Sequence, residues 1–288
     1  MKIKFTLVLL LINFILIVSC ISRKDIVLSS SNKHINKNLR VKWIKIPAGE
    51  FKMGSNHGNS DESPVHTVFL DDYFISKYEI THTQYLYFLN DIKANPKGTY
   101  NGQELIDMDD SDCALAYNKE FIFKANKYAL TPDTPVIEVT WYGAKEFCHW
   151  LSKKTNSEIS LPTEAQWEKA CKAGKTADQY GDIGKISWYS GNSEERIHAV
   201  GQKKANSYGL YDMLGNVCEW CYDFYDKKFY LKKSSKNLKG PQKGYNKVVR
   251  GGSWKGVPSS LRSSCRSYAN PSSSFYNLGF RVVKQKSN

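Results

Sequence analysis

The sequence predicts a mixed α+β domain built from short strands, two or three helices and long ordered loops. Helix-capping patterns mark starts at Thr81, Thr140 and Thr163, and short aromatic-rich segments of extended character surround them. Two irregular stretches, 92–135 and 227–246, exceed ordinary loop lengths, so each is expected to carry local structure or function. Aromatic residues make up 13% of the 288 residues, which is enough for one sizeable core.

The N-terminus has the pattern of a lipoprotein signal peptide. Two lysines precede an apolar run over 5–18, which is too short to cross a bilayer as a helix. The run ends in Ser19-Cys20, a small residue before a cysteine, which resembles the lipobox of bacterial lipoproteins. We therefore expect a signal peptide over 1–19 and acylation (palmitate) of Cys20. The alternatives are an ordinary cleaved signal or an anchor helix with an incidental cysteine.

Charge and composition after Cys20 predict a tether followed by one domain. Residues 20–40 are polar and basic and read as a flexible lipidated tether, whereas 41–288 form the domain. The net charge of +13 includes a lysine cluster from 227 to 247. Because an exported protein rarely meets nucleic acid, we expect an exported, membrane-anchored monomer at the outer membrane or cell surface. Its basic surface suits anionic lipid or acidic polymers and not nucleic acid.

The first elements of the domain are extended. Residues 43–46 alternate in polarity and stop at a Pro-Ala-Gly turn, and 66–80 read as two short extended segments. Thr81 and Gln84 then have capping-box spacing, in which hydroxyl and amide satisfy the free N–H groups of a first helical turn. A helix is therefore expected to begin after Thr81.

Two further helices follow. Thr140 caps a helix over 141–154, whose apolar stripe has the spacing i, i+3, i+4, i+7 and consists of Ala144, Phe147, Cys148 and Leu151. Thr163 and Gln166 form a second capping box, and that helix ends at Gly174. Glycine-rich turns and aromatic strands are expected from there to the C-terminus.

Six cysteines remain beyond Cys20: Cys113, Cys148, Cys171, Cys218, Cys221 and Cys265. An even number outside the cytoplasm permits disulfides, but their connectivity does not follow from the sequence. Cys218 and Cys221 have the spacing of a redox motif or half of a zinc site. No second pair completes such a site, so we interpret the two as core or disulfide cysteines.

Blocks spread over about 240 residues carry a family resemblance. They are IPAGEFKMG at 46–54, EIT at 79–81, PV with VTW within 135–141, LPTEAQWE at 161–168, NSYGLYDMLGNVCEW at 206–220, RGGSW at 250–254 and LGFR at 278–281. In this order they resemble the formylglycine-generating enzyme (sulfatase-modifying factor) superfamily. The resemblance implies a C-type-lectin-like fold of that subtype, with short twisted antiparallel sheets, two or three helices and long ordered loops.

The resemblance does not settle the activity. Formylglycine-generating enzymes oxidise a substrate cysteine with copper held by two cysteines just after the Gly-Gly-Ser turn, but residues 252–264 contain no cysteine and Cys265 lies beyond the matching positions. Other branches bind iron through histidines, and the six histidines here have no HxH or HxxxH arrangement. We therefore predict no catalytic residue and no required cofactor.

The resemblance also implies a structural calcium site. In the family the Gly-Asn-x-x-Glu-Trp turn gives oxygen ligands to calcium, which correspond here to Asn216, the carbonyl of Val217 and Glu219. The alternative is that Asn216 and Glu219 only hydrogen-bond the turn. A second family site would involve Asn192, but 193–204 lacks suitably placed carboxylates.

The C-terminal region 254–281 alternates between two kinds of residue. Sixteen positions, separated by Leu261, Arg266 and other scaffold-type residues, could each arise from an Asn codon by changes at its two adenines alone. None is Lys, Glu, Gln, Met or Trp. They are Gly256, Val257, Pro258, Ser259, Ser260, Cys265, Ser267, Tyr268, Ala269, Asn270, Ser272, Ser273, Ser274, Phe275, Tyr276 and Asn277. The alternative is a Ser/Asn-rich surface loop.

This pattern resembles the variable lipoproteins of diversity-generating retroelements, as described for Treponema. It predicts a non-catalytic surface lipoprotein that binds a protein or glycan ligand through the sixteen positions, with Trp254, Leu261, Phe280 and the arginines supporting them from below. Two alternatives remain. One is an oxidoreductase or accessory of the formylglycine-generating type, and the other is a structural lipoprotein of an export or gliding complex.

Overall fold

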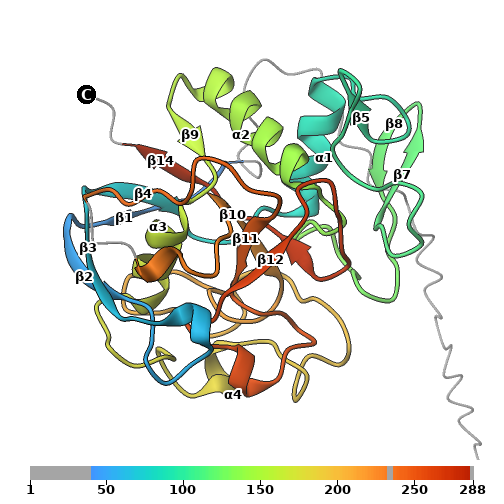
Figure 1. Ribbon diagram of the computed structural model, residues 1–288. Helices are drawn as coiled ribbons and strands as arrows, with labels where there is room; N and C mark the ends of the chain where they lie inside the picture. The colour runs from blue at the N-terminus through green and yellow to red at the C-terminus, as the bar shows by residue number, and fades with distance from the viewer. Residues whose placement is uncertain (1–39, 232–235, 286–288) are drawn as a thin grey trace, which may run out of the picture.

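The computed structural model describes residues 40–231 and 236–285 (Figure 1). The predicted signal peptide, Cys20 and nearly all of the tether lie outside the described residues. In the part that is described, no helix is long and apolar enough to span a bilayer.

One sheet brings the two ends of the domain together. Its order is β1-β4-β14-β9 and every neighbouring pair is antiparallel, so a strand near each end of the domain pairs with β4. The bounds are Trp43–Ile46 for β1, Tyr73–Ser76 for β4, Val283–Gln285 for β14 and Ile159–Ser160 for β9. The strand predicted at 43–46 is confirmed.

The second sheet carries part of the C-terminal region. Its order is β12-β11-β10-β13, with β10 and β13 parallel and the other pairs antiparallel. The bounds are Ser267–Ala269 for β12, Lys247–Arg250 for β11, Cys218–Phe224 for β10 and Leu278–Gly279 for β13. Because β12 is the edge strand, one of its sides is free of strand partners in this sheet.

The three predicted helices are confirmed. Thr81, Thr140 and Thr163 each accept a hydrogen bond from a backbone N–H of the first turn, and the first and third have complete capping boxes. The third helix ends at Lys172, two residues before the predicted Gly174, and its C-cap Ala173 has a left-handed conformation. The bounds are His82–Asp91 for α1, Trp141–Thr155 for α2, Glu164–Lys172 for α3 and Ile183–Ile186 for α4; the short 3-10 turns are η2 (Ser60–Glu62), η3 (Phe229–Leu231) and η4 (Pro258–Ser260).

Three hairpins complete the described elements. They are β2 (Gly49–Met53) with β3 (His66–Leu70), β5 (Thr99–Tyr100) with β6 (Gln103–Glu104), and β7 (Leu115–Asn118) with β8 (Glu120–Phe123). Two of them lie in the stretch 92–135, so the local structure expected there is present. In the other long stretch, η3 and the hydrogen bonds between Asn237 and Asp71 give local order.

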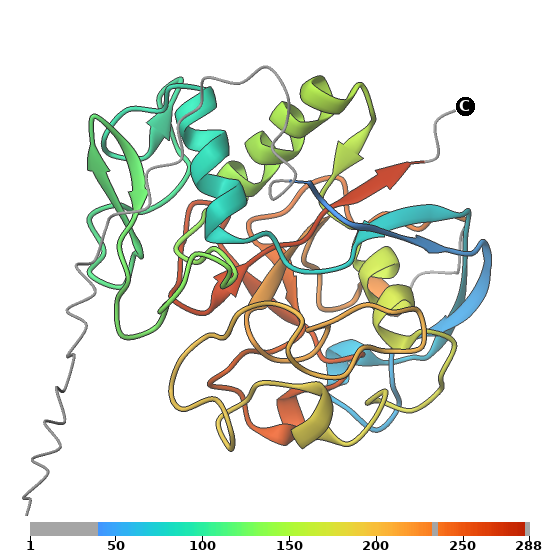
Figure 2. The ribbon, with the colours of Figure 1, turned by 180° about the vertical axis from the view of Figure 1, so that it is seen from behind.

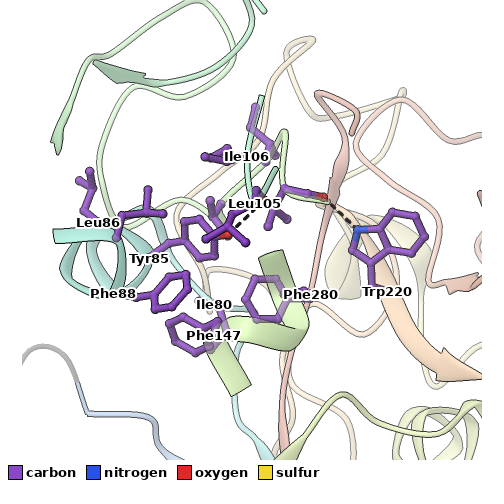
Figure 3. Close-up of a cluster of buried hydrophobic side chains, with 14 of the residues drawn as sticks. Ile80, Tyr85, Leu86, Phe88, Leu105, Ile106, Phe147, Trp220 and Phe280 are labelled. Atoms are coloured by element: carbon purple, nitrogen blue, oxygen red, sulfur yellow. Dashed lines mark hydrogen bonds between the residues drawn. The ribbon is translucent and has the colours of Figure 1, made fainter. Parts of the chain in front are cut away.

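The interior has two apolar clusters. The larger one joins α1 and α2 to the second sheet through aromatic side chains: Tyr85 stacks on Phe147, and Phe280 meets both of them edge to face (Figure 3). The other lies between the hairpin β2–β3, α3 and the first sheet. Figure 2 shows α1 and α2 at one end of the molecule and α4 at the opposite end. The loops of the C-terminal region run across the space between these ends.

Candidate ligand-binding surface

The sixteen predicted positions all reach the surface. Each is exposed or half-buried in the structure, and Val257, Tyr268 and Phe275 are 54%, 52% and 44% exposed. Among the residues that separate or flank them, Trp254, Leu261, Arg266, Leu278 and Phe280 are buried, whereas Arg262 and Pro271 are half-buried. That the sixteen positions bind a ligand stays a prediction.

One part of this surface lies on the edge strand β12. Ser267, Tyr268 and Ala269 pair with β11, and the ring of Tyr268 stacks on Tyr225 at a centroid distance of 4.3 Å. The pairing with β11 fixes the backbone while these three side chains remain exposed or half-buried. This segment therefore presents its side chains from a backbone that is held by the β11–β12 ladder.

A second part is formed where two loops meet. The ammonium group of Lys255 donates to the hydroxyl of Tyr276 at 3.0 Å, and the amide of Asn277 donates to the hydroxyl of Ser253 at 3.1 Å. Tyr276 also stacks on Tyr128 at 5.3 Å. Tyr276 is therefore half-buried and partly supports the loop, whereas Phe275 beside it is 44% exposed.

Buried arginines hold the chain beneath the surface. Arg266 makes two hydrogen bonds to the carboxylate of Glu164, at 2.7 and 2.9 Å. Arg250 donates to Glu164 at 2.9 Å and to Glu168 at 2.5 Å, and its guanidinium also donates to the carbonyl of Ser263. All four charged residues are at most 6% exposed. The network therefore ties the C-terminal region to α3 from below.

A third arginine anchors the segment between η4 and β12. Arg262 donates to both carboxylate oxygens of Glu62 at 2.6 Å, across 200 positions of sequence. Burial alone would raise the pKa of Glu62, but the hydrogen bonds from Arg262 and other donors prevail and the pKa is lowered. Glu62 is thus held ionised as a fixed partner for this segment.

Sequence reasoning missed Glu138, which lies directly behind the patch. Its backbone N–H donates to the carbonyl of Phe275 at 3.2 Å, and its carbonyl accepts from the N–H of Asp107 at 3.0 Å. The residue is 1% exposed and has a φ of 56°, and the side chain of Ser274, one of the sixteen patch residues, acts on its carboxylate and opposes the rise in its pKa. Burial, and then the charge of Asp110, raise its pKa to about 8. The signal available in the sequence was a glutamate inside the apolar run 136–139.

Two of the three residues predicted to bind calcium, Asn216 and Glu219, have side-chain partners within the protein, and the backbone N–H of Val217 donates to Glu79 at 3.2 Å. Asn216 donates to Glu79 at 2.9 Å and accepts from the N–H of His198 at 3.0 Å. Both oxygens of Glu219 accept from Arg281, at 2.7 and 2.8 Å, and Trp167 donates to the same carboxylate. This donor set offers calcium no open carboxylate, because an ion would have to displace Arg281. We derive no step through calcium.

The cysteines near the patch are not activated thiols. All six cysteines of the described residues are free, and Cys221 packs in one apolar cluster while Cys218 packs against the other. The two therefore do not face a common metal. Burial raises the pKa of Cys265, and it raises that of Cys218 to about 12. These groups are protonated at neutral pH, whereas copper-thiolate chemistry needs the deprotonated form.

Comparison with known proteins decides the family. The model of the sulfatase-modifying factor enzyme 1-like domain matches residues 30–286. The chain belongs to this family. The mixed α+β architecture and the resemblance seen in the sequence blocks are thereby confirmed, and the fold is the C-type-lectin-like fold of the formylglycine-generating subtype.

Relatives of this sulfatase-modifying factor domain have diverse names. Serine/threonine-protein kinase pkn1 of Chlamydia caviae is 34% identical over 256 residues, which are 85% of this chain and 38% of that protein. The chain thus spans little more than a third of that relative. Formylglycine-generating enzyme of Mus musculus is 29% identical over 286 residues, covering 84% of this chain and 75% of the enzyme.

Two solved structures of the same fold cover nearly the whole domain. PvdO from Pseudomonas aeruginosa has a TM-score of 0.71 at 26% identity and covers 85% of this chain and 94% of its own. Treponema denticola variable protein 1 has a TM-score of 0.68 at 27% identity and covers 85% and 95%. The chain is thus similar both to proteins named as formylglycine-generating enzymes and to a protein named as variable. The names alone do not assign its function.

Proposed function

We propose that this protein is a lipid-anchored, surface-displayed, non-catalytic binding protein that engages diverse ligands through the sixteen positions between Gly256 and Asn277. The observation that supports the proposal most is the alternation along 254–281. Every one of the sixteen side chains reaches the surface, while Trp254, Leu261 and Arg266 between them are buried. The likeness to Treponema denticola variable protein 1 agrees with it.

The chemistry of the surface suits recognition of changing partners. Tyr268, Phe275 and Tyr276 offer aromatic contact area at low cost in side-chain entropy, and the serines and asparagines around them adapt their hydrogen bonds. A specific interface needs about 800 Å² on each partner. The proposal therefore requires that the three segments 256–260, 267–270 and 272–277 act together as one surface.

The enzymatic alternative has less support. The segment 252–264 lacks the two cysteines that would hold copper, and Cys265 carries a raised pKa instead of an activated thiolate. Binding through the surface is the function that this arrangement favours over oxidation.

Sequencing of the gene in its native population tests the proposal. We expect variation concentrated in the sixteen codons from Gly256 to Asn277, and a neighbouring reverse transcriptase gene with a template repeat carrying Asn codons at those positions. The buried positions Trp254, Leu261 and Arg266 should be invariant and serve as internal controls. Variation spread evenly over the domain, with no template repeat, would show that the surface is an ordinary loop region.

Membrane attachment is tested at Cys20, which follows the apolar run and Ser19. In the native host or a bacterium that processes lipoproteins, the wild-type protein should partition into detergent and incorporate labelled palmitate. Cys20→Ala should abolish the label and leave the precursor unprocessed or the protein released, since no acylated chain remains. Ser19→Ala retains a small residue and should behave as wild type. Unchanged labelling of Cys20→Ala would refute the anchor.

A further inference from the structure

A basic cavity lies beside the hairpin β2–β3. Its volume is about 670 Å³, within the range of sites for small organic ligands. The walls come from β2–β3, from α3 and from the segment 174–178, and Figure 1 shows the hairpin and α3 side by side. Four lysines line the cavity (Lys52, Lys169, Lys172 and Lys175), against two carboxylates (Glu50 and Asp178).

Lys169 gives this cavity an uncompensated cation. It is 5% exposed, and its ammonium group donates to the carbonyls of Pro47 and Gly49 at 2.8 and 2.9 Å. No carboxylate forms an ion pair with it among the described residues. An ammonium group has three donors, so one remains for a ligand. A buried charge without a counter-ion is costly, and an anion entering the cavity would offset that cost.

Lys172 shows the contrast within the same helix. Its ammonium group is 2.7 Å from Glu168 and also donates to the carbonyls of Lys52 and Gly54, so all three donors are used. Lys172 is therefore a structural cation. Lys175 is exposed and bonds only the carbonyl of Tyr180 among the hydrogen bonds of the described residues. Lys52 is also exposed and donates only to the hydroxyl of Thr67 among the hydrogen bonds of the described residues, so Lys52, Lys169 and Lys175 have donors to spare, and Lys169 is the buried one.

The cavity continues toward the C-terminal patch. A second, more open depression of about 700 Å³ shares Lys175, Ala177 and Asp178 with the first and reaches Pro258, Ser259 and Arg262. The two hollows lie side by side at these three shared residues, and below they are together called the groove. A small anion would occupy only one of them, whereas an extended polymer would follow both.

We propose that this groove binds an acidic polysaccharide, with one anionic sugar unit in the cavity beside Lys169 and the chain leaving past Lys175 toward Ser259. Half-buried Phe51 and Tyr208 supply apolar wall for a sugar ring, and the lysines attract its carboxylate, sulfate or phosphate. The inference rests on the proposed function in one respect, that the protein is displayed at the cell surface. It does not depend on the patch, because none of the sixteen patch residues lines the cavity beside Lys169.

Binding is measured by calorimetry at low salt. The full-length protein in detergent is titrated with dextran sulfate, and uncharged dextran serves as the control ligand. Lys169→Met and Lys175→Gln should each weaken binding about tenfold, the loss of one charge-assisted hydrogen bond. Lys153→Gln, an exposed lysine on α2, removes the same charge elsewhere and should leave binding within about twofold. If Lys169→Met does not fold, Lys175→Gln decides alone.

Three outcomes would overturn the proposal. The first is equal weakening by Lys153→Gln and Lys175→Gln, which would mean nonspecific charge attraction. The second is binding of dextran as strong as that of dextran sulfate. The third is competition by inorganic sulfate as effective as the polymer at equal charge, which would mean a simple ion site. The double variant Tyr268→Ser/Phe275→Ser should keep dextran sulfate binding, so failure of the patch proposal is distinguishable.

Discussion

Replacing Glu164 with alanine is expected to lower the free energy of unfolding by about 3–5 kcal/mol, because two buried guanidinium groups lose their shared carboxylate. Glu164 is 4% exposed, and its carboxylate accepts hydrogen bonds from Arg250 and from Nε and Nη2 of Arg266. No water can replace it without opening the junction between α3 and the C-terminal region. Urea unfolding followed by circular dichroism measures the change.

The matched control is an ion pair near the surface. Lys154→Ala removes the partner of Asp91, a pair separated by 2.8 Å whose lysine side chain is 39% exposed. It should cost less than about 1 kcal/mol, since solvent screens the pair. Similar losses in Glu164→Ala and Lys154→Ala would contradict the anchoring role of the buried network.

Glu138→Gln is expected to stabilise the protein at alkaline pH and to have little effect near pH 4. Burial, with the charge of Asp110, raises the pKa of Glu138 from 4.5 to about 8, so the folded protein holds a proton that the unfolded chain has lost over that interval. Stability therefore falls as pH rises from about 4.5 to about 8, by linkage. Glutamine cannot ionise, and the variant escapes this loss.

Melting temperatures of wild type and Glu138→Gln from pH 4 to pH 9 check this. The melting temperature of the variant should exceed that of the wild type by an amount that grows as pH rises. Each kcal/mol of stability corresponds to about 2–4 °C in a domain of this size. Glu164→Gln should have the opposite effect and lower the melting temperature at neutral pH. Burial alone would raise the pKa of Glu164, but Arg266 and Arg250 lower it, so the ionised carboxylate stabilises the fold. Parallel curves for wild type and Glu138→Gln would mean that Glu138 is ionised without penalty.

Local features of the fold were accessible from the sequence because local interactions determine them. The Thr81 and Thr163 capping boxes join residues three apart, and the helix after Thr140 has its apolar stripe within one element. The exposed pattern between Gly256 and Asn277 was likewise visible as composition. Each of these predictions needs only neighbours in the chain.

The supporting contacts were not accessible in the same way. Arg262 and Glu62 are 200 positions apart, and Arg266 and Glu164 are 102 apart, so no spacing in the sequence pairs them. In the sequence Glu138 is one polar residue in an apolar run, and the burial of its carboxylate follows only from the packing around it. The lysine-lined cavity similarly combines segments from β2 to Asp178 that are distant in sequence.

The claim that a replaceable surface rests on a fixed scaffold is tested most directly by two displayed libraries. In one, the sixteen codons between Gly256 and Asn277 are randomised as any-base, any-base, pyrimidine. In the other, the same scheme is applied to five buried positions: Trp254, Leu261, Arg266, Leu278 and Phe280. The fraction of members that resist protease is measured by sorting. We predict that most of the first library and few of the second remain folded, because surface changes usually cost less than about 0.5 kcal/mol and loss of a buried aromatic about 3–5 kcal/mol. A first library that unfolds as often as the second would contradict the account.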